Sequence, residues 1–131
     1  MQPSAPPIRV LLVEDNPGDA RLIRVYLAEA GPPGFEVAHA DRLAPALERL
    51  ADAGAEVVLL DLSLPDAHGV DTVRRTLAAT PEVPIVVLTG LDDEAVALDA
   101  LQHGAEDYLV KGRVDGPLLS RSIRYAIERK R

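Results

Sequence analysis

The fold is decided by one short stretch, Val57-Val58-Leu59-Leu60-Asp61, in which four apolar residues are followed directly by an acid. An apolar run of this length, without polar alternation, is typical of a strand buried on both faces. Similar runs lie at 8–13, 84–88 and 108–110, and a weaker one lies at 35–40. Strands of this kind occur in parallel sheets that helices cover on both sides. The sequence therefore predicts an α/β protein with this stretch at the centre of its sheet.

Segments with helical periodicity separate the five apolar runs. The predicted helices cover 17–30, 43–53, 70–79, about 93–103 and 116–131. Asn16 can cap the first helix, whose first position is Pro17, and Asp92 or Asp93 can cap the fourth. Alternating strands and helices predict a five-stranded parallel sheet, doubly wound, of the flavodoxin-like (βα)5 type.

Length and composition predict one domain at 8–131, preceded by a flexible Pro-rich tail at 1–7. The chain has 131 residues, of which 47% are hydrophobic and 27% charged, and no cysteine, which excludes disulfides and thiolate zinc sites. Its net charge of -7 argues against direct nucleic acid binding. No apolar run approaches the roughly 20 residues that cross a bilayer. We expect a cytoplasmic protein that does not contact the membrane.

Polar residues stand where the predicted strands end. Glu14 and Asp15 follow the first strand, Asp61 follows the third, Thr89 the fourth and Lys111 the fifth. In open α/β sheets, ligands bind at the carboxyl ends of the strands. We therefore expect these five side chains to meet at one edge of the sheet.

The chemistry of this set favours phosphoryl transfer with a divalent cation. Two carboxylates about 4 Å apart repel by roughly 4 kcal/mol at an effective dielectric constant of 20, and a cation removes that cost. Carboxylate oxygens without nearby His or Cys suit Mg2+. Lys111 and Thr89 can bind phosphoryl oxygens, and Asp61, on the middle strand, is the best candidate nucleophile. Each residue alone could be an ordinary cap or turn residue, and only the combination carries the prediction.

Four segments of the chain resemble the response-regulator receiver signature. They are VLLVEDNP (10–17), VVLLDLSLPD (57–66), IVVLTG (85–90) and GAEDYLVK (104–111). The resemblance extends from about Ile8 to Arg131 and implies a phosphoacceptor switch of a two-component system rather than an enzyme acting on other substrates.

The resemblance also implies individual roles. Asp61 would be phosphorylated by a sensor histidine kinase. Glu14 and Asp15 would hold Mg2+ together with Asp61 and the backbone carbonyl of Ser63. Lys111 would bond the phosphoryl group, and Thr89 and Tyr108 would form the switch pair.

One residue departs from the family pattern. The family usually has proline after the lysine, often with a cis peptide bond, and here that residue is Gly112. A cis bond before a non-proline residue costs about 2.5–4 kcal/mol. Either the Lys111–Gly112 bond is trans and the loop has another shape, or glycine tolerates the strain.

Other function classes fit less well. An aspartyl-phosphate phosphatase of the dehalogenase type wants an acid where Ser63 stands. A flavin-binding electron carrier would need a Ser/Thr-rich phosphate loop, where this chain has Glu14 and Asp15. A degenerate receiver would lack part of the set that is intact here. The chain is either a free-standing receiver or a receiver module of a longer signalling protein with a cyclase, phosphatase or kinase output.

The basic outer side of the last helix suggests two readings. It is a solvated face with cations near the helix C-terminus, or it mediates a homodimer on activation. In the second reading, Arg121 and Arg124 meet Asp99 and Asp107 of a second copy. The histidines His39, His68 and His103 lack a metal-ligand spacing and read as solvated.

Overall fold

The computed structural model describes residues 5–131. Its strands are β1 (Ile8–Val13), β2 (Phe35–Ala40), β3 (Val57–Asp61), β4 (Ser63–Leu64), β5 (Ala67–His68), β6 (Ile85–Thr89) and β7 (Asp107–Val110). Its helices are α1 (Pro17–Ala28), α2 (Leu43–Asp52), α3 (Val70–Ala79), α4 (Glu94–Gln102) and α5 (Gly116–Lys130), with a short 3-10 helix η1 (Lys111–Arg113). The predicted tail at 1–7 lies largely outside the described residues; within it, 5–7 are exposed and have no regular structure.

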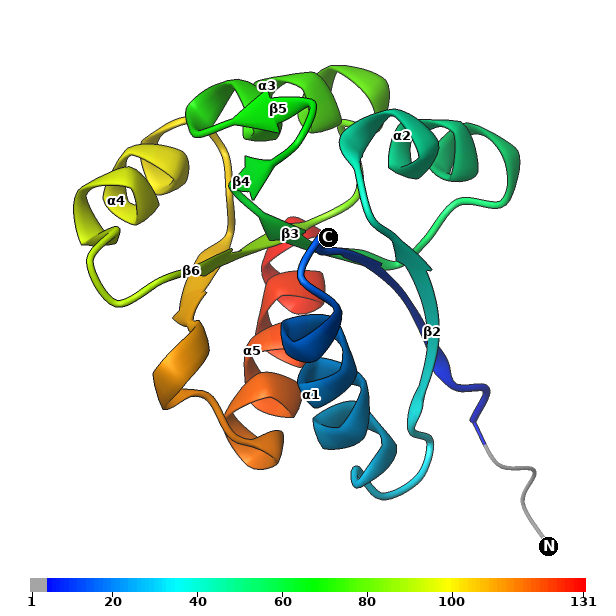
Figure 1. Ribbon diagram of the computed structural model, residues 1–131. Helices are drawn as coiled ribbons and strands as arrows, with labels where there is room; N and C mark the ends of the chain where they lie inside the picture. Colours follow the sequence, from blue (N-terminus) through cyan, green and yellow to red (C-terminus); the bar gives the residue numbers. More distant parts are fainter. Residues whose placement is uncertain (1–4) are drawn as a thin grey trace, which may run out of the picture.

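The main sheet has five strands in the order β2-β1-β3-β6-β7, and every neighbouring pair is parallel. Helices α1 and α5 cover one face, and α2, α3 and α4 cover the other (Figure 1). The predicted α/β fold with a doubly wound parallel sheet is confirmed. Within residues 5–131, no helix has both the length and the apolar character needed to span a membrane.

The position of β3 between two cores explains why apolar and polar residues do not alternate in its sequence. Val58 and Leu60 belong to the core beneath α2 and α3, whereas Val57 and Leu59 belong to the core beneath α1 and α5. All four are 0% exposed. The strand at the centre of the sheet thus serves two cores, and it delivers its last residue, Asp61, to the carboxyl edge.

The boundaries of the predicted helices and strands agree with the structure to within two residues. Three local features differ from the prediction: the cap of α4, the β4–β5 hairpin and η1. Asn16 caps α1 as expected, its side chain accepting the backbone N–H of Asp19 at 2.9 Å. Asp93 occupies the N-cap position of α4, but its side chain makes no cap hydrogen bond, so that part of the prediction is wrong. The β4–β5 hairpin and η1 were not predicted, since elements of two or three residues leave no periodicity to detect.

Replacement of Gly104, in the turn between α4 and β7, should destabilise the folded protein. The φ of Gly104, +115°, disfavours any L side chain, and a Cβ there would lie 2.5 Å from Leu77 Cδ1. We expect Gly104→Ala to lower the free energy of unfolding by about 1–3 kcal/mol, as measured by urea denaturation. Gly112→Ala is the matched control, because its Cβ would meet Leu91 at an ordinary 3.8 Å. Equal effects of the two substitutions would contradict this explanation.

Candidate functional site

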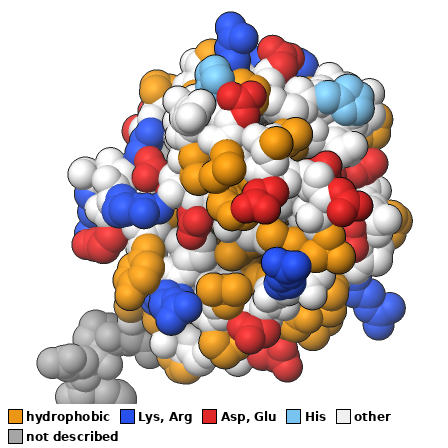
Figure 2. Space-filling view, turned by 90° about the vertical axis from the view of Figure 1, so that its left-hand side faces the viewer, with side chains coloured by type: hydrophobic (Ala, Val, Ile, Leu, Met, Phe, Trp, Pro, Cys, Tyr) orange, Lys and Arg blue, Asp and Glu red, His pale blue; other side chains and the backbone are white. Residues whose placement is uncertain are grey.

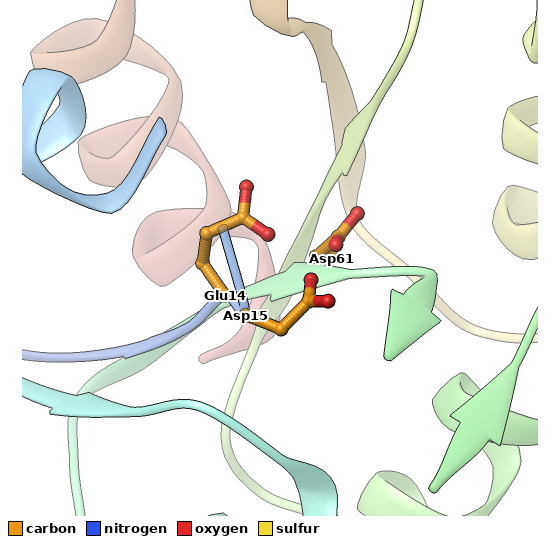
Figure 3. Close-up of side chains that lie close together, drawn as sticks. All are labelled: Glu14, Asp15 and Asp61. Atoms are coloured by element: carbon orange, nitrogen blue, oxygen red, sulfur yellow. The ribbon is translucent and has the colours of Figure 1, made fainter. Parts of the chain in front are cut away.

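Three carboxylates converge at the carboxyl edge of the sheet. Glu14 and Asp15 directly follow β1, and Asp61 ends the neighbouring strand β3. Because Val13 is in register with Leu60, the two strand ends lie side by side. Each of the three acids offers an oxygen within 4.8 Å of the others (Figure 3). The structure therefore brings together the three acids that the sequence placed in one site.

Glu14 is the most unusual member of this cluster. Its side chain is 0% exposed, and neither carboxylate oxygen has a hydrogen bond of good geometry among the residues described. The pKa of Glu14 is raised to about 8, with burial as the main cause, Asp61 adding to the rise and Lys111 opposing it. A buried carboxylate that lacks hydrogen-bond partners is an oxygen donor suited to a hard cation.

Lys111 lies directly after β7 and points into the acids. Its ammonium pairs with Glu14, lies 3.4 Å from Asp61 Oδ1, and lies 3.1 Å from Asp19 Oδ2. Burial acts to lower the pKa of Lys111, but these carboxylates outweigh burial and raise the pKa above its usual value. The lysine is therefore positively charged at neutral pH.

The geometry of the Lys111–Gly112 peptide bond, which the sequence left open, is defined by the structure. The only cis peptide bond in residues 5–131 is Pro32–Pro33, so the Lys111–Gly112 bond is trans. The chain enters the 3-10 helix η1 at this point instead of making a cis turn. With glycine in place of the family's usual proline, the bond is trans and Lys111 still lies at the acids.

A small cavity of 180 Å³ opens beside Asp61. Ser63 and Thr89 are among its lining residues. Thr89, the last residue of β6, is buried, and its hydroxyl donates to the carbonyl of Leu109 at 3.4 Å. A larger hollow of 720 Å³ lies beside α2, but Glu14, Asp15 and Asp61 are not among its lining residues. The smaller cavity is the relevant one, because Asp61 lines it together with Ser63 and Thr89.

Tyr108 lies on β7, on the same face of the sheet as Thr89. The strand register pairs Tyr108 with Val87 and Val110 with Thr89, so the two residues are one side-chain repeat apart on neighbouring strands. Tyr108 is partly buried and packs against the core beneath α2, α3 and α4. The two residues of the expected switch pair are therefore near neighbours.

Three contacts at the site were not found by sequence reasoning. Asp19 reads as a capping residue, yet its side chain reaches Lys111. His39 reads as solvated, yet its Nε2 lies 2.8 Å from the backbone carbonyl oxygen of Glu14 and must donate to it. Asp66 accepts the backbone N–H groups of Leu43 and Ala44 at 2.8 and 2.9 Å. No local sequence pattern indicates these contacts, because each joins residues that are far apart in the chain.

Asp66 caps α2 from a distance, because Arg42 at the N-cap position supplies no side-chain acceptor. Slight burial acts to raise the pKa of Asp66, but the hydrogen bonds from Ala44 and Leu43 outweigh it and hold the pKa below its usual value. Since the folded-state pKa is lowered, this contribution to stability is present above the unfolded pKa and is lost as the pH falls through the folded one.

We expect Asp66→Ala to lower the free energy of unfolding by about 1 kcal/mol at pH 7, and by less in acid. Urea denaturation at pH 7 and pH 3 measures both values. Asp41→Ala is the matched control, since Asp41 is an exposed acid at the same helix end that contacts Arg42 instead of the backbone. A pH-independent loss in Asp66→Ala would contradict the capping role.

Comparison with known proteins agrees with this geometry. The family model of the response regulator receiver domain matches residues 10–123. The chain belongs to the response-regulator receiver family. Receiver domains of response regulators are phosphoacceptor switches of two-component systems, phosphorylated by sensor histidine kinases.

Solved receiver domains share the fold. A response regulator receiver domain protein from Clostridium thermocellum has a TM-score of 0.82 at 30% identity, covering 94% of this receiver and 96% of that chain. A sensor protein from Polaromonas has the same TM-score, 0.82, at 29% identity, covering 96% of this receiver and 100% of that chain.

Curated relatives are longer than this receiver. The transcriptional regulatory protein AruR of Pseudomonas aeruginosa is 36% identical over 116 residues, which are 87% of this chain and 47% of AruR. The regulatory protein LuxO of Vibrio vulnificus is 34% identical over 100 residues, which are 76% of this chain and 21% of LuxO. The chain thus spans about half of one relative and a fifth of the other. Neither name points to the cyclase, phosphatase or kinase output that the sequence left open.

Proposed function

We propose that this receiver accepts a phosphoryl group on Asp61 from a sensor histidine kinase. The observation that carries the proposal is the placement of Lys111 within ion-pair distance of both Glu14 and Asp61, where Asp61 also lines a cavity together with Thr89. In the transfer, the bond from phosphorus to the donor nitrogen breaks while a bond from phosphorus to an Asp61 carboxylate oxygen forms. No general base need be found, because catalysis of this transfer is mainly positioning and charge neutralisation.

The donor set fits Mg2+. Glu14, Asp15 and Asp61 supply carboxylate oxygens within 4.8 Å of one another, and Glu14 has buried oxygens without hydrogen-bond partners. The family role adds the backbone carbonyl of Ser63, which lies on the β4 strand that follows Asp61. When bound, Mg2+ would neutralise charge on the acids and on the incoming phosphoryl group.

Lys111 and Thr89 would bind the phosphoryl oxygens. The Lys111 ammonium supplies a permanent positive charge, and the Thr89 hydroxyl is free to exchange its long contact with Leu109 for a charged acceptor. Movement of Thr89 would change the space beside Tyr108 and so carry the signal to the surface of β7. On this account the receiver catalyses only its own phosphorylation and dephosphorylation, and acts in the cytoplasm.

The proposal is tested with acetyl phosphate as the phosphodonor. In Mg2+ the protein should acquire a phosphoryl group that hydroxylamine removes, as expected of an acyl phosphate and not of a serine or threonine ester. The same incubation in EDTA should leave it unlabelled. Labelling that resists hydroxylamine, or that proceeds equally in EDTA, would refute the proposal.

We further propose that the activated receiver self-associates, through fewer charged pairs than the sequence suggested. Figure 2 shows the side of the molecule that carries α4, where apolar and charged side chains are interspersed. The exposed apolar residues there are Leu91, Val96 and Leu98. Three of the four expected residues have contacts within the chain: Asp107 accepts from Ser122 at 2.8 Å, Arg124 lies over the Phe35 ring, and Asp99 Oδ1 lies 3.5 Å from His103 Nδ1. Because the Asp99–His103 contact is exposed and the weakest of these, pairing across the interface falls to Arg121 and Asp99.

Arg121→Glu should weaken the association of the activated receiver. An exposed ion pair contributes about 0.2–1 kcal/mol, and a symmetric dimer contains two copies of it. Sedimentation of the beryllofluoride complex, for the parent and the variant, measures the difference. Glu128→Arg on the same helix controls for charge reversal as such. A dimer that does not respond to Arg121→Glu would leave the basic face of α5 as a solvated surface.

A further inference from the structure

Asp19 makes a contact that the metal site does not require. Its Oδ2 lies 3.1 Å from Lys111 Nζ, although the two residues are 92 positions apart in the chain. Asp19 is not among the acids whose oxygens lie within 4.8 Å of one another, so it offers no ligand atom to that cluster. Its place in the first turn of α1 is fixed, because Asn16 accepts its backbone N–H. Asp19 is thus a fourth carboxylate at the site, directed at the lysine alone.

The Lys111 ammonium is surrounded by acids and donates a hydrogen bond to Asp19. An ammonium has three donors and no acceptor, and three carboxylates surround this one: Glu14, Asp19 and Asp61. A phosphoryl group on Asp61 would add about −1.5 to −2 charges and several strong acceptor oxygens at the same place. Its oxygens would compete with these carboxylates, Asp19 included, for the positive charge and the donors of Lys111.

The contact with Asp19 is the easiest of the three to give up. The Asp19 side chain is 41% exposed, compared with 0% for Glu14 and 7% for Asp61. Water can therefore replace the lysine at Asp19, whereas solvent does not reach the buried side chain of Glu14 to replace the lysine there. Asp19 would also repel an incoming phosphoryl group, because it adds a negative charge that is not used to bind the metal.

We propose that Asp19 is a positioning residue that holds Lys111 in the unphosphorylated form and lowers the affinity of the site for a phosphoryl group. The inference rests on the proposed function of Asp61. Because Asp19 is partly solvated, its effect is that of a screened ion pair. Removing its charge should therefore raise the affinity for beryllofluoride, a phosphoryl analogue, by about two- to fivefold.

The experiment is a beryllofluoride titration at saturating Mg2+, with saturation established separately for each variant and binding followed by amide NMR signals. Asp19→Asn should bind about two- to fivefold more tightly than the parent, and Asp19→Glu, which keeps the charge, should bind like the parent. Glu29→Gln is the matched control: it removes one charge from the exposed far end of the same helix and should not change the affinity.

Two results would overturn the inference. Asp19→Asn could bind beryllofluoride no more tightly than the parent, which together with a lowered urea midpoint would mean that Asp19 serves only the helix end. Alternatively, Glu29→Gln could tighten binding as much as Asp19→Asn, which would mean that net charge alone matters. If the parent itself does not bind beryllofluoride, the proposed role of Asp61 is wrong. That outcome can be told apart from a failure of the Asp19 inference, in which the parent binds but the variants do not differ as expected.

Discussion

In metal-free buffer, the free energy of unfolding should fall by several kcal/mol as the pH rises from 5 to 9. The cause is Glu14, whose pKa is raised from an ordinary 4.5 to about 8. Between these values the folded protein keeps a proton that the unfolded chain releases, so rising pH favours unfolding. Each pKa unit corresponds to about 1.4 kcal/mol. The stabilisation from this retained proton is fully present below the unfolded-state pKa of 4.5 and is lost as the pH rises through the folded-state pKa of about 8.

Glu14→Gln should flatten this pH profile, because the amide has no proton to exchange. Urea denaturation at pH 5, 7 and 9 in EDTA measures the slope. Glu56→Gln is the control, since Glu56 is exposed and paired with Arg9, and the parent slope should persist in it. Saturating Mg2+ should also flatten the profile of the parent, because a bound cation keeps Glu14 ionised. An unchanged slope in Glu14→Gln would contradict the burial of an ionisable Glu14.

Mg2+ should stabilise the parent strongly and Asp15→Asn weakly. A ligand at 100 times its dissociation constant adds about 2.7 kcal/mol to the stability of the folded state, and a domain of this size gains roughly 3–5 °C in Tm per kcal/mol. Loss of one of three clustered carboxylates should weaken binding by about tenfold or more, which removes about 1.4 kcal/mol at fixed Mg2+. Without metal, Asp15→Asn should be at least as stable as the parent, since it relieves repulsion among the acids.

Thermal unfolding with and without Mg2+ measures this difference. Asp71→Asn is the control, because Asp71 is an exposed acid in the first turn of α3 outside the acidic cluster. It should show the same Mg2+-induced shift as the parent. Equal shifts in Asp15→Asn and the parent would remove Asp15 from the metal site.

The features that followed from the sequence were those set by burial on two faces. The run 57–60 could occupy only the middle of a covered sheet, and parallel strands necessarily bring their carboxyl ends to one edge. The convergence of Glu14, Asp15 and Asp61 was therefore predictable before any coordinate was known. Strand β2 was predicted less clearly because it is an edge strand, and its side chains are mostly half-buried.

The features that did not follow depend on the orientation of one element relative to another. Nothing in the local sequence shows that Asp19 faces Lys111, because this depends on how α1 leaves the sheet. In the same way, Asp66 caps α2 only because the β4–β5 hairpin folds back beside the start of that helix. Side-chain contacts across such junctions are long-range in sequence and carry no periodic signal.

The central claim is that Asp61 is the residue that accepts the phosphoryl group. Intact-protein mass spectrometry after incubation with acetyl phosphate and Mg2+ tests it most directly, with the parent and Asp61→Asn treated side by side. The account predicts one added phosphoryl group on the parent and none on Asp61→Asn, with both proteins folded. A phosphoryl group on Asp61→Asn at the parent's level would contradict the account.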